Sequence, residues 1–199
     1  MSTNSRKDKR TNKQFASDIK SYTKKEAIWA NILKTELTER GHKVEYIDNG
    51  IDNSGKIIKN TSNQVTNADF LFKIDKQDYL FEIKTCDQNK NFYDLSYITY
   101  KRSSLRSALK QNSRIITVDR LWWMVMRTDA IQRIIDNFKS ESYNNFASGK
   151  KAYRIYNSTM KNMTSENKEK NKFQLMRWSS DKAKSLIEKY SNTLFRRKQ

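Results

Sequence analysis

Two short runs of aromatic and β-branched residues, separated by only four polar residues, constrain the fold of this chain most strongly. The runs span residues 68–74 and 79–85, with residues 75–78 between them. Segments of this composition form β-strands. A linker of four residues lets the second strand fold back beside the first. The sequence therefore predicts an antiparallel hairpin over residues 68–85.

A helix is expected before this hairpin. Thr23 and Glu26 have the S/T-x-x-E spacing of a capping box, which marks a helix start, and Gly41 is a typical stop. Between them, apolar residues recur at helical intervals at Ile28, Trp29, Ile32, Leu33 and Leu37. The pattern predicts a helix that begins near residue 23 and buries one face.

The remaining patterns indicate an α/β protein. A strand is expected at 43–47, with a weaker strand pattern at 56–59 and a helix over 94–111. Two strands at 114–118 and 121–126 follow, then a helix over 129–138 and a short strand at 153–156. Ser179 or Ser180 can start a last helix. Strands and helices that alternate in this order predict a mixed sheet with helices packed on it.

The charge is distributed unevenly along the chain. Lys and Arg number 40 against 22 Asp and Glu, a formal net charge of +18. Residues 1–25 carry +6 and residues 139–199 carry +10, whereas residues 26–138 carry only +2. This division predicts a basic flexible arm (1–22), a folded core (23–138) and a basic C-terminal extension with a terminal helix (139–199). So large an excess favours a polyanionic partner, above all nucleic acid.

The scarce residue types exclude many functions. One Cys, one His (His42) and four scattered Gly leave no disulfide scaffold, no Cys-based zinc finger, no H-E-x-x-H helix and no Walker or dinucleotide loop. No organic cofactor is therefore expected. The chain shows no secretory signal, and its longest apolar run, residues 121–126, is too short to span a bilayer. We expect a soluble, cytoplasmic protein without a membrane partner.

Three charged residues of the hairpin form a chemically suggestive group. Glu82 and Lys84 are two residues apart on a strand, so they project from the same face. Asp69 begins the partner strand and can converge on them. Two neighbouring carboxylates repel each other, and Mg²⁺, which prefers oxygen ligands, relieves that repulsion. A lysine beside such a pair can orient an attacking water.

This pattern resembles the PD-(D/E)xK nuclease superfamily, whose fold is restriction-endonuclease-like or Holliday-junction-resolvase-like. The resemblance rests on Asp69, twelve intervening residues and then Glu82-Ile83-Lys84; Ala68 stands where the family usually has Pro. It implies a central mixed sheet flanked by helices. It also implies a Mg²⁺-dependent endonuclease, with Mn²⁺ as a substitute, that hydrolyses phosphodiester bonds in DNA. Many members act as dimers or tetramers, so a homodimer is compatible with it.

The resemblance also assigns roles to individual residues. Asp69, Glu82 and Lys84 are the expected catalytic residues. The metal would be held by the two carboxylates and the Ile83 carbonyl. The preceding helix would add Glu26 as a further ligand. The helix after the motif would contact nucleic acid through Lys101, and Arg102 and Arg106 are available on the same helix.

Each assignment has a structural alternative. Glu82 and Lys84 could be a solvent-facing pair on an edge strand, Asp69 could cap a turn, and the capping box alone explains Glu26. His42 fits a surface residue better than a catalytic one. Of the adjacent residues Trp122 and Trp123, one must face away from the other if they lie on a strand, and it could stack on a base. The same charge pattern suits a non-catalytic nucleic-acid-binding protein or a nuclease acting on RNA.

Overall fold

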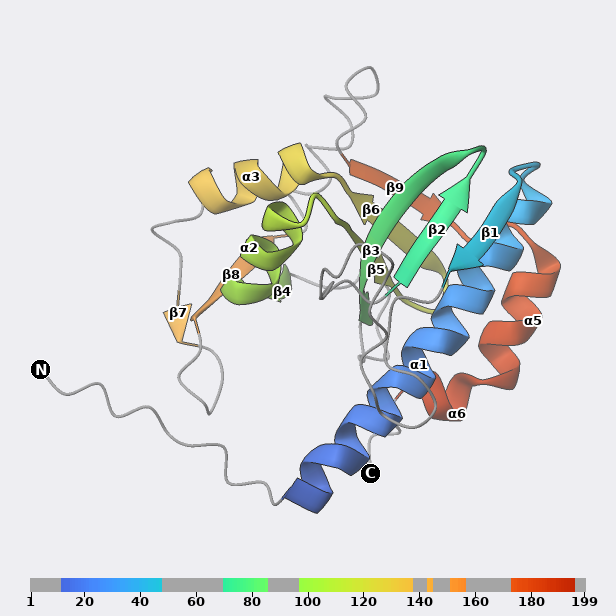
Figure 1. Cartoon of the computed structure of the whole chain (residues 1–199), viewed down its shortest axis with the longest axis horizontal. Coiled ribbons are helices and arrows are strands. Elements are labelled where there is room, and N and C mark those ends of the chain that lie inside the picture. The colour runs from blue at the N-terminus through green and yellow to red at the C-terminus, as the bar shows by residue number, and fades with distance from the viewer. Residues whose placement is uncertain are drawn as a thin grey trace, which may run out of the picture.

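A six-stranded mixed sheet forms the centre of the molecule, and helices flank it (Figure 1). The computed structural model describes residues 12–47, 70–85, 97–137, 143–144, 151–156 and 173–195. The helices are α1 (Asn12–Glu39), α2 (Arg102–Lys110), α3 (Thr128–Asn137), α5 (Asp181–Lys189) and α6 (Ser191–Leu194). The strands are β1 (Val44–Ile47), β2 (Phe70–Ile74), β3 (Gln77–Thr85), β4 (Tyr97–Lys101), β5 (Arg114–Val118), β6 (Trp122–Met126), β7 (Tyr143–Asn144), β8 (Lys151–Tyr156) and β9 (Phe173–Arg177).

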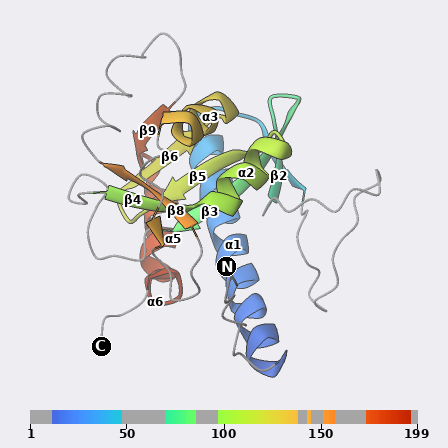
Figure 2. The ribbon, with the colours of Figure 1, turned by 90° about the vertical axis from the view of Figure 1, so that its left-hand side faces the viewer.

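The strand order of the main sheet is β1-β2-β3-β5-β6-β9. All neighbouring strands are antiparallel except β3 and β5, which are parallel. A parallel pair needs a crossover connection, and that connection contains β4 and α2. A second sheet, β4-β8-β7, lies beside α2 and α3, and Figure 2 views the molecule from this side. The α/β class with a central mixed sheet is confirmed.

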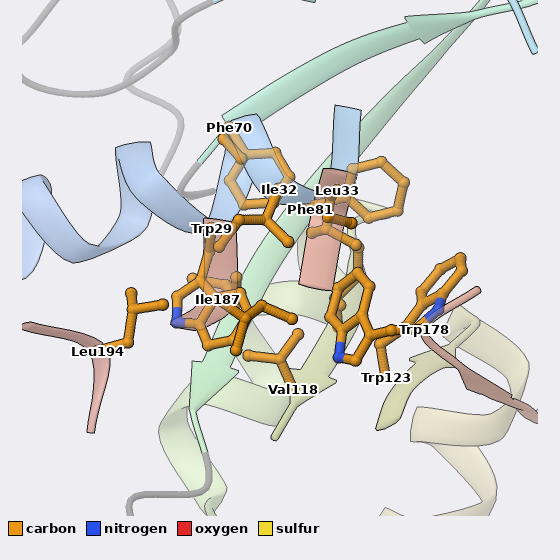
Figure 3. Packing of buried hydrophobic residues seen from close by; sticks show 14 of the residues in the cluster. Trp29, Ile32, Leu33, Phe70, Phe81, Val118, Trp123, Trp178, Ile187 and Leu194 are labelled. Carbon is orange, nitrogen blue, oxygen red and sulfur yellow. The ribbon is translucent and has the colours of Figure 1, made fainter. Parts of the chain in front are cut away.

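Apolar layers cover both faces of the main sheet. On one face, α1, α5 and α6 pack against β2, β3, β5 and β6 through Trp29, Leu33, Ile187 and Leu194 (Figure 3). On the other face, β4, β8, α2 and α3 pack against β5 and β6. Because side chains alternate along a strand, β5 and β6 contribute to both layers. Trp122 packs in the second layer and Trp123 in the first, so both tryptophans are packing residues.

Helix α1 begins at Asn12, well before the predicted start. The capping box at Thr23 and Glu26 was therefore the wrong interpretation, since both residues lie inside the helix. Its N-terminal turns project beyond the sheet (Figures 1 and 2). Residues 12–22 contain neither Gly nor Pro. Once the packed part of a helix has formed, each added residue gains a hydrogen bond without a new nucleation cost.

The predicted hairpin is confirmed, but its turn is shorter than expected. Phe70 pairs with Phe81 and Ile74 with Gln77, so only Asp75 and Lys76 form the turn. Both have positive φ, 49° and 73°. Positive φ at two central residues is typical of a type I′ turn, whose twist matches that of the flanking strands.

The helix predicted over residues 94–111 is half wrong. Residues 97–101 form β4, which pairs with β8, and the helix starts only at Arg102. Residues 94–96 and the strand pattern at 56–59 lie outside the described residues. Ile98 and Tyr100 point into the apolar layer between the two sheets. Burial of this alternating pair favours a strand over a helical continuation.

The C-terminal region adds elements to the main fold. Strand β9 extends the main sheet beside β6 and was not predicted from sequence. Helix α5 starts as expected, because the Ser180 hydroxyl accepts a hydrogen bond from the Ala183 amide at 3.1 Å and caps the helix. Trp178, between β9 and α5, stacks between Trp29 and Trp123 at centroid distances of 6.0 and 5.7 Å. Residues 173–195 are thus part of the core layer that α1 forms.

Candidate functional site

Glu82 and Lys84 lie on an interior strand of the main sheet. Their strand, β3, lies between β2 and β5, so neither residue is on an edge strand. The residues that alternate with them, Phe81 and Ile83, are buried in the layer that contains α1. By the alternation of side chains along a strand, Glu82 and Lys84 face the opposite side, toward the layer of α2 and the second sheet. The predicted shared face of these two residues is confirmed.

The two side chains form a close ion pair. Lys84 Nζ donates to Glu82 Oε1 over 2.5 Å. Only 11% of the Glu82 side chain and 34% of the Lys84 side chain are exposed. Burial removes most of the water from the Glu82 carboxylate, and Lys84 supplies a compensating charge. The alternative of a solvent-facing pair on an edge strand is therefore wrong.

Two buried hydroxyl groups, one from the adjacent strand β5 and one from β4, lie in the surroundings of the ion pair. In the parallel ladder, Glu82 lies beside Ile115 and Lys84 beside Thr117. Thr117 is buried, and its Oγ1 lies 2.7 Å from the hydroxyl of Tyr100 on β4. This hydrogen bond joins the second sheet to the main sheet next to Lys84. The site therefore combines a carboxylate, an ammonium group and a hydroxyl pair.

Other predicted metal ligands are distributed differently. Asp69 lies outside the described residues, directly before β2. The Ile83 side chain packs in the apolar layer, so only its backbone carbonyl could act as a ligand. Glu26 is half-buried on α1, which covers the face of the sheet opposite to Glu82. Within the described ranges, no group of three or more His, Cys, Asp or Glu side chains is placed to hold a metal ion.

The predicted nucleic-acid contacts surround the start of α2. Lys101 is the last residue of β4 and directly precedes the helix, and its side chain is exposed. Arg102 begins α2 and is half-buried; no acceptor in the described part of the chain reaches its buried Nε. Arg106, one turn later, is exposed. Since Tyr100 reaches Thr117 beside Lys84, the chain enters α2 from the vicinity of the ion pair.

His42 is a surface residue, as expected. It is exposed, and its Nδ1 lies 2.7 Å from the Asp75 carboxylate in the hairpin turn. The Lys43 amide donates to the same carboxylate at 3.0 Å. The hydrogen bonds from His42 and Lys43 lower the pKa of the Asp75 carboxyl. These contacts join the loop after α1 to the hairpin turn, so the role of His42 is structural.

Sequence reasoning missed Tyr100 and Thr117. Thr117 stands in a run of β-branched residues that predicts a strand and nothing more, and Tyr100 lies within the expected helix.

No helix in the described part of the chain is long and apolar enough to cross a membrane. Comparison of the chain with protein-family models, curated proteins and solved structures finds no match.

Proposed function

We propose that the protein is a Mg²⁺-dependent endonuclease that hydrolyses phosphodiester bonds in DNA. The observation that carries the proposal is the ion pair of Glu82 and Lys84 on an interior strand. Two well-packed apolar residues would often stabilise such a position as well or better. A charged pair at such an interior position is therefore a candidate reaction site.

The second carboxylate of the proposed site is Asp69. Phe70 is paired with Phe81 in the antiparallel ladder. In such a ladder the residue before Phe70 is opposite the residue after Phe81, which are Asp69 and Glu82. The proposal thus requires the pairing of β2 and β3 to continue by one residue. Two carboxylates would then share one face, and their repulsion favours a divalent cation.

The donor set fits a magnesium ion, which takes carboxylate and carbonyl oxygens and retains several waters. Glu82, Asp69 and the Ile83 carbonyl would hold it. When bound, Mg²⁺ supplies Lewis-acid stabilisation of the charge that develops on the phosphate. Glu82 presently accepts a hydrogen bond from Lys84, so its carboxylate is already oriented by a neighbour on the same strand.

Lys84 would position the attacking water and balance negative charge on the phosphate. Its side chain is more exposed than that of Glu82, so Lys84 is the member of the pair that a phosphate can approach more readily. Lys101 and Arg106 are exposed near the start of α2. They would contact the nucleic-acid backbone without reading its sequence.

Cleavage of plasmid DNA tests the proposal. The wild-type protein should nick or cut the plasmid with Mg²⁺ or Mn²⁺, and EDTA should abolish the cleavage. Asp69→Ala, Glu82→Ala and Lys84→Ala should each lose at least about 100-fold in rate while still binding DNA. Efficient cleavage in excess EDTA would contradict the proposed metal site.

Glu45→Ala and Lys73→Ala are matched controls. Glu45 and Lys73 are exposed, oppositely charged and paired across β1 and β2 of the same sheet. Both variants should cleave at the wild-type rate. If the three site variants also keep that rate, the ion pair is structural. Binding without cleavage by the wild-type protein would favour a non-catalytic nucleic-acid-binding protein, and cleavage of RNA in place of DNA would favour a ribonuclease.

A further inference from the structure

A second cationic side chain, Arg114, lies on the face of the main sheet opposite to Glu82 and Lys84. Arg114, the first residue of β5, is half-buried, and its guanidinium carbon lies 4.1 Å from the centre of the Tyr79 ring. Along β5, Arg114 alternates with Ile115 and shares its face with Ile116, which is buried in the layer of α1. Arg114 and Tyr79 therefore face away from Glu82 and Lys84.

The Tyr79 ring is a fixed support for the guanidinium. Its hydroxyl donates to Gln77 Oε1 over 2.5 Å, and its ring packs against Phe81 with a centroid distance of 6.2 Å. A guanidinium stacked on an aromatic ring keeps its N–H edge available for a planar or tetrahedral anion. The stacking thus orients Arg114, and its interaction with Tyr79 offsets part of the cost of burying the guanidinium.

A second arginine increases the positive charge at this place. Met126 pairs with Ile115 across β5 and β6, which brings the next residue, Arg127, beside Arg114. Burial lowers the pKa of the Arg114 guanidinium, the interaction with Tyr79 partly opposes this, and the charge of Arg127 lowers the pKa further. Arg127 Nε lies 3.9 Å from the Asp129 carboxylate. Arg114 itself forms no ion pair with any described residue.

This arrangement is unfavourable in the absence of an anion. A half-buried guanidinium has lost part of its hydration, and its neighbour has the same charge. A carboxylate partner would ordinarily compensate, but here the compensation comes only from the ring and hydroxyl of Tyr79 among the described residues. A phosphate group could accept hydrogen bonds from both guanidinium groups at once, and Arg is the side chain best suited to this.

We propose that Arg114 and Arg127 bind a phosphate group of a nucleic-acid backbone. The nature of this partner rests on the proposed function and on the net charge of +18. Arg114 faces the opposite side of the sheet from the Glu82–Lys84 pair, and Arg127 directly follows β6 beside it. The two arginines would therefore form a second nucleic-acid contact, separate from the proposed cleavage site, and enlarge the surface that binds nucleic acid.

Binding of a fluorescein-labelled DNA duplex in EDTA, measured against salt concentration, tests this contact without any need for cleavage. Each phosphate contact contributes a slope of about 0.9 in log affinity against log salt, which is roughly eight-fold in affinity at 0.1 M salt. Combined replacement of Arg114 and Arg127 by Ala should lower the slope by about 0.9 and the affinity at 0.1 M salt by roughly eight-fold. Arg114→Lys, which keeps the charge but loses the fork, should give a smaller loss.

Arg133→Ala is the matched control, because Arg133 is an exposed arginine of α3. The proposal is overturned if the Arg114 and Arg127 variants lose no more slope than this control. Circular dichroism and the urea midpoint check that each variant folds; if Arg114→Ala unfolds, the exposed Arg127→Ala decides alone. Loss of slope in a protein that never cleaves would sustain this contact and refute only the endonuclease. A wild-type protein that binds no DNA would refute both.

Discussion

Replacing Glu36 should destabilise this fold more than any surface substitution. Glu36 is fully buried on α1, with 0% of its surface exposed. Its Oε1 accepts hydrogen bonds from the Ser179 amide at 2.9 Å, the Ser179 hydroxyl at 2.7 Å and Arg40 Nε at 2.8 Å. Its Oε2 accepts one from the Ser180 amide at 2.9 Å. One carboxylate thus joins the end of α1 to the segment that starts α5.

The magnitude follows from what Glu36→Ala would leave behind. Two backbone amides and one hydroxyl would lose a charged acceptor, and Arg40 would lose its carboxylate partner. Removing one partner from a buried, hydrogen-bonded ion pair costs about 3–5 kcal/mol. Domains of this size are stable by about 5–15 kcal/mol. Glu36→Gln should cost less, because its amide keeps one acceptor oxygen.

Urea unfolding followed by tryptophan fluorescence measures the loss. Trp178 adjoins Ser179 and stacks on Trp29 and Trp123, so the signal reports on the same junction. Glu39→Ala is the control, since its ion pair with Lys182 is exposed and such pairs contribute little. If Glu36→Ala unfolds within about 1 kcal/mol of wild type, the buried carboxylate does not hold α1 to α5 and the reasoning fails.

Three further predictions concern stability. Burial opposes ionisation of Glu36, but the hydrogen bonds from Ser179, Ser180 and Arg40 outweigh it and lower its pKa below 4.5. The stability that the ionised Glu36 gives the fold is therefore complete above that pH and is lost as the pH falls through the folded-state pKa. Urea midpoints from pH 7 to 3 should show less acid sensitivity in Glu36→Gln. Lys76→Gly should raise the free energy of unfolding by up to about 1 kcal/mol, since Lys76 has φ 73°; a decrease would contradict strain at this turn. Ser180→Ala should cost about 1 kcal/mol through loss of the α5 cap, whereas Ser185→Ala, on the exposed face of that helix, should leave the urea midpoint unchanged.

The hairpin and the strands β5 and β6 could be predicted because their signal is local. Each is a short run of aromatic and β-branched residues, and each is bounded by polar residues. Local propensity and burial agree in these runs. The α/β class follows from their alternation with helical patterns. Helix α1 was located correctly from Trp29 to Leu37, where its apolar spacing reflects real packing.

The errors arose where long-range contacts decide the structure. Residues 97–101 are compatible with either a strand or a helix, and their pairing with β8, some fifty residues later, selects the strand. Strand β9 (Phe-Gln-Leu-Met-Arg) has no regular alternation of polar and apolar residues, and it is a strand because it pairs with β6 at the sheet edge. The start of α1 was misplaced because a capping box is a local signal that a continuing helix overrides.

For the candidate site, the sequence predicted which residues share a face of one strand, but it did not predict which residues of other strands lie beside them. Glu82 and Lys84 share a face because they are two residues apart, which needs no knowledge of the rest of the fold. The positions of Thr117 and Tyr100 next to them depend on the parallel register of β3 and β5 and on the second sheet. Neither can be deduced from local pattern. The polar surroundings of the ion pair thus belong to tertiary structure.

The fold also changes how the basic flanks can be tested. Residues 139–199 carry a net charge of +10, but residues 173–195 within them carry only +2 and supply β9, α5 and the Trp178 stack. Truncation of the C-terminal region would therefore remove an edge strand and part of one apolar layer together with the charge. Weaker binding by such a truncation would not separate unfolding from lost phosphate contacts. Charge-neutralising substitutions outside residues 173–195 leave these elements in place, so their effect on the salt dependence of binding reports on phosphate contacts alone.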